Sequence, residues 1–446
     1  MIKLGELLLS WKSLEGINSN DFIDGWIEEK KKTIEVNIDK IPFSQCSGWM
    51  YDSKSGFIRR NNMSFFAISG IQRFRDKHLE NQPIILQPEI GYLGIICKKI
   101  NGILHFLMQA KIEPGNVNKV QISPTIQATK SNFTQKHGGD KPLYLDYFLF
   151  VNPKNVICDQ IQSEQSSRFL GKRNRNMVIY VEDEVEVSPN HIWMTLGQIK
   201  RLMKIDNCVN MDTRTVISSI PFCLLEKDSI SLEKSYSLFG CLNDYKMFNY
   251  VQPELVDIFS LKNWTFNDYE LKSADDYFPF KIIFCNISIE GREVRKWCQP
   301  LFEATKPAFF GLFVSRSSNK LEVLVKAKPE IGCKEGIELG PTVQSDFRED
   351  EVDVLYLKFM DYVKEKKNIV VDVMLSEEGG RFYHESNRNV IVSVDKNDIK
   401  RLPEGYFWCD LFTLQTYMLV NNILNIQLRS MLSLLDYKTV FGDENV

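Results

Sequence analysis

The sequence predicts an α+β protein built from two copies of one domain-sized unit. Three observations carry this prediction: long blocks recur in the same order, the offset between the copies is nearly constant, and each copy mixes strand-like with helix-like segments. Each unit holds roughly two hundred residues, an ordinary domain size. We expect 1–232, with an N-terminal helix, to form the first unit and 233–446 the second.

The recurrence covers most of the chain. Paired blocks lie in the same order in the two halves: 47–52 with 262–268, 82–99 with 299–316, 107–129 with 324–346, 162–176 with 375–389, and 191–220 with 406–435. The offset is unbroken from the pair Gln82 and Gln299 to the pair Gln127 and Gln344. Periodicity weakens between 223 and 246, where we place the boundary. A repeat this long indicates gene duplication rather than a solenoid.

Hydrophobic periodicity predicts the individual elements. The N-terminus predicts an amphipathic helix rather than a signal peptide, with Leu4, Leu7, Leu8 and Trp11 on one face. Alternating or continuous apolar runs predict strands at 105–113, 144–151, 176–182, 321–328, 354–360 and 389–395. Helical spacing predicts helices over 195–206 and around 411–419.

Composition excludes several classes of protein. The 446 residues are 43% hydrophobic and 12% aromatic, enough for large cores, and the net charge of −3 favours neither nucleic acid nor an anionic membrane as a partner. No apolar run is long enough to span a bilayer. Ten scattered cysteines without a CxxC pair indicate reduced thiols in the cytoplasm. Neither a zinc motif, a dinucleotide fingerprint nor a phosphate-binding loop motif is present.

Two recurring polar segments, 162–176 and 375–389, suggest ligand contacts. Arginine binds phosphate through a bidentate fork, and asparagine offers a donor and an acceptor together. With the hydroxyls and amide of 123–127 and the Trp49 ring, such groups suit a nucleotide diphosphate carrying a sugar. Singly, each also fits a solvated strand end, an ion pair, a turn or a core position. These patterns alone therefore predict a duplicated α+β protein, for which an anionic ligand is one interpretation of the polar segments.

Longer motifs in both halves carry a family resemblance. They are FLMQAKIEPGNVNKVQISPTIQATKSNF, QSEQSSRFLGKRNRNMV, WMTLGQIKRLM, NMDTRTVISSI, GREVRKWCQPL and SEEGGRFYHESNRNVIV. In these motifs the chain resembles the NDP-hexose 2,3-dehydratases of deoxysugar biosynthesis, from about Trp49 to Leu435. The resemblance implies two tandem Nudix-like domains, a homodimer, and a dTDP-4-keto-6-deoxyglucose substrate. Like that family, the chain lacks a working Nudix box, since REVR at 292–295 is not followed by a metal-binding helix.

The reaction that this resemblance implies is loss of water. The 4-keto group acidifies the C3 proton, a general base removes it, and donors around the C4 oxygen stabilise the enolate. The C2 hydroxyl then leaves, and the enol relaxes to a 3,4-diketo-2,6-dideoxy sugar. This sequence of steps needs no cofactor and no metal. The product would pass to a downstream 3-ketoreductase or aminotransferase.

The resemblance also implies substrate-binding residues in both halves. In the first half they are Trp49, Ser123, Pro124, Thr125, Ile126, Gln127, Ser163, Arg168, Asn174, Arg175 and Asn176. In the second half they are Trp264, Arg295, Gly340, Pro341, Thr342, Val343, Gln344, Glu377, Arg381, Tyr383, Asn387, Arg388 and Asn389.

The resemblance does not identify the general base. Glu113 and Glu164 are our candidates, because burial beside the sugar-binding segments could tune a carboxylate, although either also fits a strand-end ion pair. The copies differ, with Gly340 where the first has Ser123, so we expect unequal pockets and chemistry in the first half. The rival functions are a Nudix-type hydrolase, which the missing metal-binding helix disfavours, and a non-catalytic nucleotide-sugar binding protein.

Overall fold

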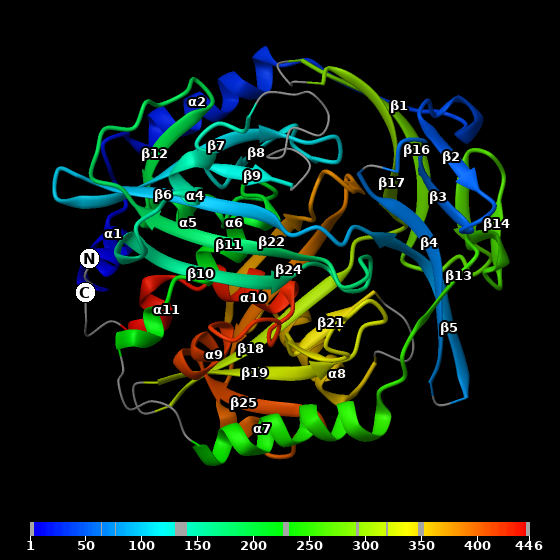
Figure 1. Cartoon of the computed structure of the whole chain (residues 1–446). Helices are drawn as coiled ribbons and strands as arrows, with labels where there is room; N and C mark the ends of the chain where they lie inside the picture. Colours follow the sequence, from blue (N-terminus) through cyan, green and yellow to red (C-terminus); the bar gives the residue numbers. More distant parts are fainter. Residues whose placement is uncertain are drawn as a thin grey trace.

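Four β-sheets form the framework of the protein. The computed structural model describes residues 4–63, 65–75, 77–129, 141–225, 232–290, 294–317, 320–346 and 352–442. Within these ranges each repeat contributes one larger, seven-stranded sheet and most of one smaller sheet of five or six strands. The two smaller sheets lie together at one end of the molecule (Figure 1).

The elements follow one order twice. The first repeat contains α1 (Leu4–Lys12), α2 (Asn20–Thr33), β1 (Val36–Lys40), β2 (Trp49–Asp52), β3 (Phe57–Arg60), β4 (Ala67–Arg75), β5 (His78–Leu86), β6 (Gly91–Ile100), β7 (Ile103–Ile112), β8 (Val120–Ser123), β9 (Ile126–Ala128), α4 (Leu145–Leu149), β10 (Val156–Ser163), β11 (Arg173–Tyr180), β12 (His191–Thr195), α5 (Leu196–Leu202) and α6 (Met211–Ser218).

The second repeat contains α7 (Leu232–Asp244), β13 (Glu254–Val256), β14 (Trp264–Phe266), β15 (Glu270–Ser273), β16 (Phe280–Ile289), β17 (Lys296–Ala304), β18 (Phe309–Ser317), β19 (Lys320–Lys328), β20 (Glu338–Gly340), β21 (Val343–Ser345), α8 (Val354–Lys364), β22 (Ile369–Ser376), β23 (Phe382–Tyr383), β24 (Ser386–Ser393), β25 (Tyr406–Asp410), α9 (Leu411–Met418), α10 (Ile426–Ser433) and α11 (Tyr437–Phe441). The structure confirms the α+β prediction and the duplicated order.

Most predicted elements are present. The strands predicted at 105–113, 176–182, 321–328 and 389–395 correspond to β7, β11, β19 and β24, and the predicted helices to α1, α5 and α9. In α1, Leu7 and Trp11 are buried in the main core, as the amphipathic pattern indicates. Among the described residues none of the ten cysteines forms a disulfide, and eight of them are buried. None of the helices in the described ranges combines the length and apolar character that a membrane crossing requires.

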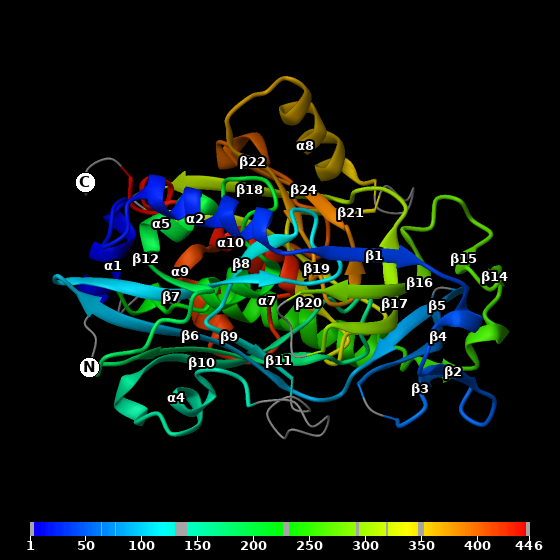
Figure 2. The same ribbon diagram turned by 90° about the horizontal axis from the view of Figure 1, so that it is seen from above.

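Two strand predictions were wrong, because 144–151 and 354–360 fold as the helices α4 and α8. Asp353 caps α8 by accepting hydrogen bonds from the backbone N–H groups of Leu355 and Tyr356. Each helix inserts one phenylalanine against a glycine of the larger sheet: a Cβ on Gly94 would lie 2.4 Å from Phe148, and one on Gly311 would lie 2.8 Å from Phe359. Tertiary packing therefore overrides the strand propensity of these aromatic runs. Figure 2 shows the two helices on opposite sides of the molecule.

The two repeats exchange one strand each. β1 pairs antiparallel with β16 of the second repeat, and β13 pairs antiparallel with β4 of the first. Each smaller sheet therefore contains a strand from the other repeat, and the repeats fold as an interlocked pair. The boundary proposed between 232 and 233 falls at the first residue of α7.

A reciprocal pair of buried arginines joins the repeats at α6 and α10. Arg214 donates to Ser430 Oγ at 2.7 Å, and Arg429 donates to Thr215 Oγ1 at 2.9 Å. Both guanidinium groups also donate to backbone carbonyls, and Arg214 bonds the carbonyl oxygen of Ser376 at 2.7 Å. The side chains are 0% and 1% exposed. Because buried charges are tolerated only when their hydrogen bonds are satisfied, this pair fixes how the repeats meet.

We predict that Arg214→Ala lowers the free energy of unfolding by more than about 3 kcal/mol, because it removes several charge-assisted hydrogen bonds and leaves buried carbonyls unpaired. Urea unfolding followed by circular dichroism measures the loss. Lys154→Ala, at an exposed position, should change stability by less than about 0.5 kcal/mol. An Arg214→Ala protein as stable as this control would contradict the structural role.

A second prediction concerns Glu338, which accepts from Ser163 Oγ at 3.0 Å where the first repeat has Gln121. Burial raises the pKa of Glu338 from 4.5 to about 8, although Arg429 opposes the shift. The folded state therefore binds the proton more tightly than the unfolded state. The resulting stability is complete below pH 4.5 and is lost as the pH rises through 8.

We expect the wild type to lose more stability between pH 5 and pH 8 than Glu338→Gln does, by about 1 kcal/mol or more. Urea unfolding of both proteins at the two pH values provides the measurement. Identical pH dependence in the two proteins would show that Glu338 is ionised in the folded protein at pH 5.

Candidate active site

In each repeat a hairpin loop packs against a loop of the other repeat. Gly115 N donates to Gly379 O at 2.6 Å, and His384 N donates to Gly115 O at 2.9 Å. The same contact recurs where Gly332 N donates to Ser166 O at 2.9 Å. A Cβ on Gly115 would lie 1.6 Å from Phe382 O, so only glycine permits this approach. The loop contacts bring residues from both repeats into each of two polar clusters.

The first cluster gathers buried and half-buried polar side chains between β7, β9, β10, β11, α6 and the loop before β23. Its members are Lys111, Glu113, Gln127, Glu164, Lys172, Asn174, Asn210, Asp212, Glu378 and Arg381. Four are carboxyls and three are cations. Such a density of ionisable groups is typical of a functional site.

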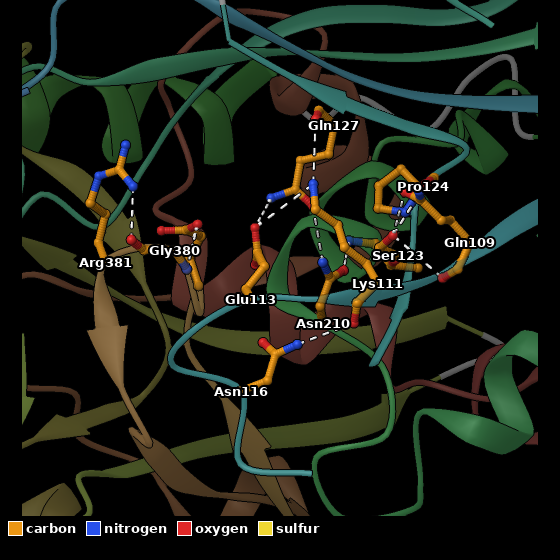
Figure 3. A network of polar contacts seen from close by, with 12 residues as sticks. Gln109, Lys111, Glu113, Asn116, Ser123, Pro124, Gln127, Asn210, Gly380 and Arg381 are labelled. Atoms are coloured by element: carbon orange, nitrogen blue, oxygen red, sulfur yellow. Dashed lines mark hydrogen bonds and ion pairs between the residues drawn. The ribbon is translucent and has the colours of Figure 1, made fainter. Parts of the chain in front are cut away.

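Amide groups hold one carboxylate of the first cluster (Figure 3). Gln127 Nε2 donates to Glu113 Oε1 at 3.1 Å, and Asn210 Nδ2 donates to Gln127 Oε1 at 3.3 Å. Lys111 Nζ lies 3.8 Å from the same Glu113 oxygen. Lys111 and Gln127 keep partial solvent exposure, so this edge of the cluster is accessible from outside.

The other carboxyls lie deeper. Glu164 accepts from Asn174 Nδ2 at 2.6 Å across the β10–β11 pair. Asp212 stands in the first turn of α6, which Asn210 caps by accepting from Thr213 N at 2.8 Å. Asp212 Oδ1 is buried and has no hydrogen-bond partner among the described residues.

Burial and mutual repulsion favour the protonated forms of these acids. Burial raises the pKa of Glu378 to about 7, and the charges of Glu113 and Glu164 add to the shift. Burial also raises the pKa of Asp212 well above 3.8, with Glu164, Glu378 and Glu113 acting in the same direction. A cluster with such groups can both accept and donate protons near neutral pH.

Two buried cations of the first cluster, Lys172 and Arg381, act on each other electrostatically and are here called the cation pair. Arg381 donates to Gln87 Oε1 at 3.0 Å, and its guanidinium carbon stacks 4.3 Å from the Phe66 ring centre. Lys172 donates to the carbonyl oxygen of Glu89. Burial lowers the pKa of Lys172, and the charge of Arg381 lowers it further, while Glu164 and Glu89 oppose the change. A lysine and an arginine within electrostatic range of each other suit a phosphate group.

The second cluster contains the equivalent positions of the other repeat. Its members are Lys328, Glu330, Gln344, Glu377, Glu385, Asn387, Asn425, Gln427, Gln165 and Arg168. Gln344 donates to Glu330 at 2.8 Å, as Gln127 does to Glu113, and Asn387 donates to Glu377 at 2.8 Å.

Three positions differ in charge between the clusters. Gln427 stands where the first cluster has Asp212, and Gln165 where it has Glu378. Glu385 stands where the first cluster has Lys172, and it lies 3.8 Å from Arg168. The second cluster thus replaces the lysine of the cation pair with a carboxylate that neutralises its arginine.

The structure brings several residues named from sequence into these clusters. Glu113, Glu164, Gln127 and Asn174 meet in the first, and Gln344, Glu377 and Asn387 in the second. Each of the two loop arginines named from sequence lies in the cluster that is built on the other repeat. Arg381 packs on first-repeat aromatic rings, and Arg168 packs on the second-repeat Phe280 ring at 4.1 Å, because the loops cross between the repeats.

Alternation along the strands separates Arg175 from its asparagine neighbours. Arg175 pairs with Asp159 through an Nε–Oδ1 hydrogen bond of 2.6 Å, on the sheet face opposite to Asn174. Arg388 pairs with Asp372 in the same way, at 2.9 Å. The side-chain amide of Asn176 donates to the backbone carbonyl oxygen of Asn174. In the second repeat, Asn389 donates to the backbone carbonyl oxygen of Asn387 in the same way.

The segments 123–127 and 340–344 mainly stabilise the sheets. Thr125 Oγ1 accepts from Ile96 N at 2.9 Å, and Thr342 Oγ1 accepts from Phe313 N at 3.0 Å. Ser123 donates to Gln109 Oε1 at 3.3 Å. The other members of the two segments, apart from the glutamines, are buried: Pro124, Ile126, Gly340, Pro341 and Val343. Ser163 donates to Glu338 beside α10.

Four further residues named from sequence also lie outside both clusters. Trp49 is buried, and its indole N–H donates to Cys298 O at 2.7 Å. Trp264 packs against Phe278, with ring centres 4.8 Å apart. Arg295 is exposed between β16 and β17, and Tyr383 stacks on the His384 ring at 4.2 Å. Their binding roles stay predictions.

Sequence reasoning missed Asp212, Lys172 and Glu378. The available signal was a difference between the copies: NMDTR aligns with NIQLR, and GKRNRN aligns with HESNRN. Among the described residues, no group of three or more His, Cys, Asp and Glu side chains has an arrangement that could hold a metal ion.

Comparisons with known proteins agree across nearly the whole chain. A family model described as NDP-hexose 2,3-dehydratase matches residues 20–220 and again 237–435. A protein of Saccharopolyspora spinosa named dTDP-4-dehydro-6-deoxy-alpha-D-glucopyranose 2,3-dehydratase is 36% identical, covering 92% of this chain and 89% of its own. Proteins with the same name from Streptomyces violaceoruber and Amycolatopsis orientalis are 32% and 31% identical, covering 92% and 96% of this chain and 95% and 92% of their own. The chain therefore belongs to the NDP-hexose 2,3-dehydratase family.

Proposed function

We propose that this protein is a hydro-lyase that removes the C2 hydroxyl of dTDP-4-keto-6-deoxyglucose, and that the first cluster is its active site. The observation that carries this proposal is the cation pair Lys172 and Arg381 beside four carboxyls. The cations suit the diphosphate, and the carboxyls suit proton transfer at the sugar. The names of the three relatives support the same substrate.

The cluster contains the groups that each step needs. A carboxylate removes the C3 proton, which the neighbouring ketone acidifies, and the amides of Gln127 and Asn210 with Lys111 offer donors for the C4 oxygen. The C2 hydroxyl departs as water, and the enol relaxes to the 3,4-diketo sugar. Glu113 and Glu164 stay our sequence-based candidates for the base, and the cluster adds Asp212 and Glu378. Loss of water requires no external oxidant or reductant.

The family resemblance also supports proposals for the fold of each repeat, the oligomeric state, the compartment and the next reaction. We propose that each repeat is Nudix-like, that the protein is a cytoplasmic homodimer, and that a 3-ketoreductase or an aminotransferase consumes its reactive diketone product. The lack of disulfides among the described residues supports a reducing compartment. Of the REVR motif, Val294 and Arg295 lie within the described residues, and residues 292–293 lie outside them.

The activity test uses purified protein, dTDP-4-keto-6-deoxyglucose and a 3-ketoreductase with its nicotinamide reductant. Mass spectrometry should detect the dehydrated and reduced sugar, turnover should survive EDTA, and a reaction in deuterium oxide should place deuterium at C2. Binding without turnover would indicate a non-catalytic nucleotide-sugar binding protein. Magnesium-dependent cleavage of the diphosphate would indicate a Nudix-type hydrolase.

The cation pair gives a prediction for substrate binding. Lys172→Ala removes a charge-assisted contact of roughly 1.5–3 kcal/mol and should weaken substrate binding about ten- to a hundredfold. Titration calorimetry with dTDP measures this change. Lys98→Ala, which removes the surface contact to Glu184, serves as control and should bind dTDP normally. Unchanged affinity of Lys172→Ala would place the diphosphate outside the first cluster.

A further inference from the structure

Comparing the two clusters shows which acids occur in one of them and not in the other. Glu113 and Glu164 both have glutamate counterparts, Glu330 and Glu377, in the second cluster. These counterparts also keep the same amide partners. Shared residues cannot explain chemistry confined to one cluster, so the distinguishing acids must be sought where the copies differ.

Two carboxyls occur only in the first cluster. Asp212 and Glu378 have the amides Gln427 and Gln165 as counterparts. Gln165 matches Glu378 in length, and Gln427 is one methylene longer than Asp212. An amide forms hydrogen bonds but neither accepts nor donates a proton in the way an acid does. The two exchanges therefore remove proton-transfer capacity from the second cluster and keep polar side chains there.

The geometry separates the roles of these two carboxyls. Asp212 Oδ1 is buried without a partner among the described residues. Burial and the neighbouring carboxyls raise the pKa of Asp212, so its ionised form is a stronger base than an ordinary aspartate. An unpartnered buried oxygen is available to accept a proton from a ligand. Glu378 approaches from the other repeat, beside Arg381 and Glu113, and its Oε1 accepts from Gly380 N at 2.9 Å.

We propose that Asp212 removes the C3 proton and that Glu378 protonates the departing C2 hydroxyl. This assignment rests on the proposed function and replaces Glu113 and Glu164 in the proton-transfer steps, leaving them to position the sugar. The electrons of the C3–H bond form the enolate, the C2–O bond breaks, and the proton of Glu378 leaves in the water molecule. The enol then gains a solvent proton at C2 and loses that of its C3 hydroxyl, while exchange with water restores both acids.

The test compares matched substitutions in the two clusters. Asp212→Asn and Glu378→Gln should each lower kcat by about a hundredfold or more, with substrate affinity within about fivefold of wild type. Gln427→Asn and Gln165→Asn, in the second cluster, should keep kcat within about twofold. Asp212→Glu, which retains a carboxyl, should recover part of the activity lost in Asp212→Asn.

A second readout separates chemistry from support of the fold. In deuterium oxide, NMR of recovered substrate should show C3 exchange with Glu378→Gln, because proton removal continues while elimination slows. Asp212→Asn should show no such exchange. Exchange by Asp212→Asn, or equal damage from Gln427→Asn, would overturn the assignment. So would loss of turnover in Glu113→Gln or Glu164→Gln while Asp212→Asn stays active.

The activity of the wild type separates failure of the proposed function from failure of the assignment of the two acids. If the wild-type protein does not dehydrate the sugar, the proposed function is contradicted. If the wild type dehydrates the sugar and the Asp212→Asn and Glu378→Gln variants stay active, only the assignment of these two acids is contradicted.

Discussion

The reciprocal burial of Arg214 and Arg429 between α6 and α10 is the constraint on which the rest of the structure depends. Each guanidinium reaches across to a hydroxyl and to a backbone carbonyl of the other repeat. A charge buried this deeply must meet its partners in one geometry. The exchanged strands β1 and β13 also join the two repeats, because each pairs with a strand of the other repeat in a smaller sheet. Together they fix the crossing of the loops that completes both clusters.

The crossing explains how a duplicated protein could specialise one site. Each cluster is built on the sheet of one repeat and completed by a loop of the other. A substitution in that loop therefore alters the opposite cluster, as Glu378 and Gln165 illustrate. Three exchanges of charge make the clusters chemically different, while shared amides such as Gln127 and Gln344 keep the same framework.

Much of the architecture could be predicted from sequence. The recurring blocks predict the repeat order, and hydrophobic periodicity predicts the strands β7, β11, β19 and β24. The helices α4 and α8 could not, because aromatic runs such as 144–151 favour strands until a sheet glycine accepts their phenylalanine. The clusters were predicted only in part. Glu113, Glu164 and Gln127 lie in recurring motifs, whereas the placement of Arg381 depends on a loop crossing that no local pattern encodes.

Asp212 shows a different limit of sequence reasoning. It lies within a helix of apolar, hydroxyl and buried polar residues, where a single acid in the first turn resembles an ordinary helix start. Only its unpartnered oxygen and its neighbours Glu164 and Glu378 mark it as a functional candidate. Residues of this kind are found by asking where two copies differ, rather than where they agree.

A crystal structure of the protein with bound dTDP-4-keto-6-deoxyglucose, in a slowed variant such as Asp212→Asn, tests the central claim most directly. The account predicts that the diphosphate lies between Lys172 and Arg381, with C3 of the sugar within hydrogen-bonding reach of residue 212. A sugar bound only in the second cluster, with the first cluster empty, would contradict it.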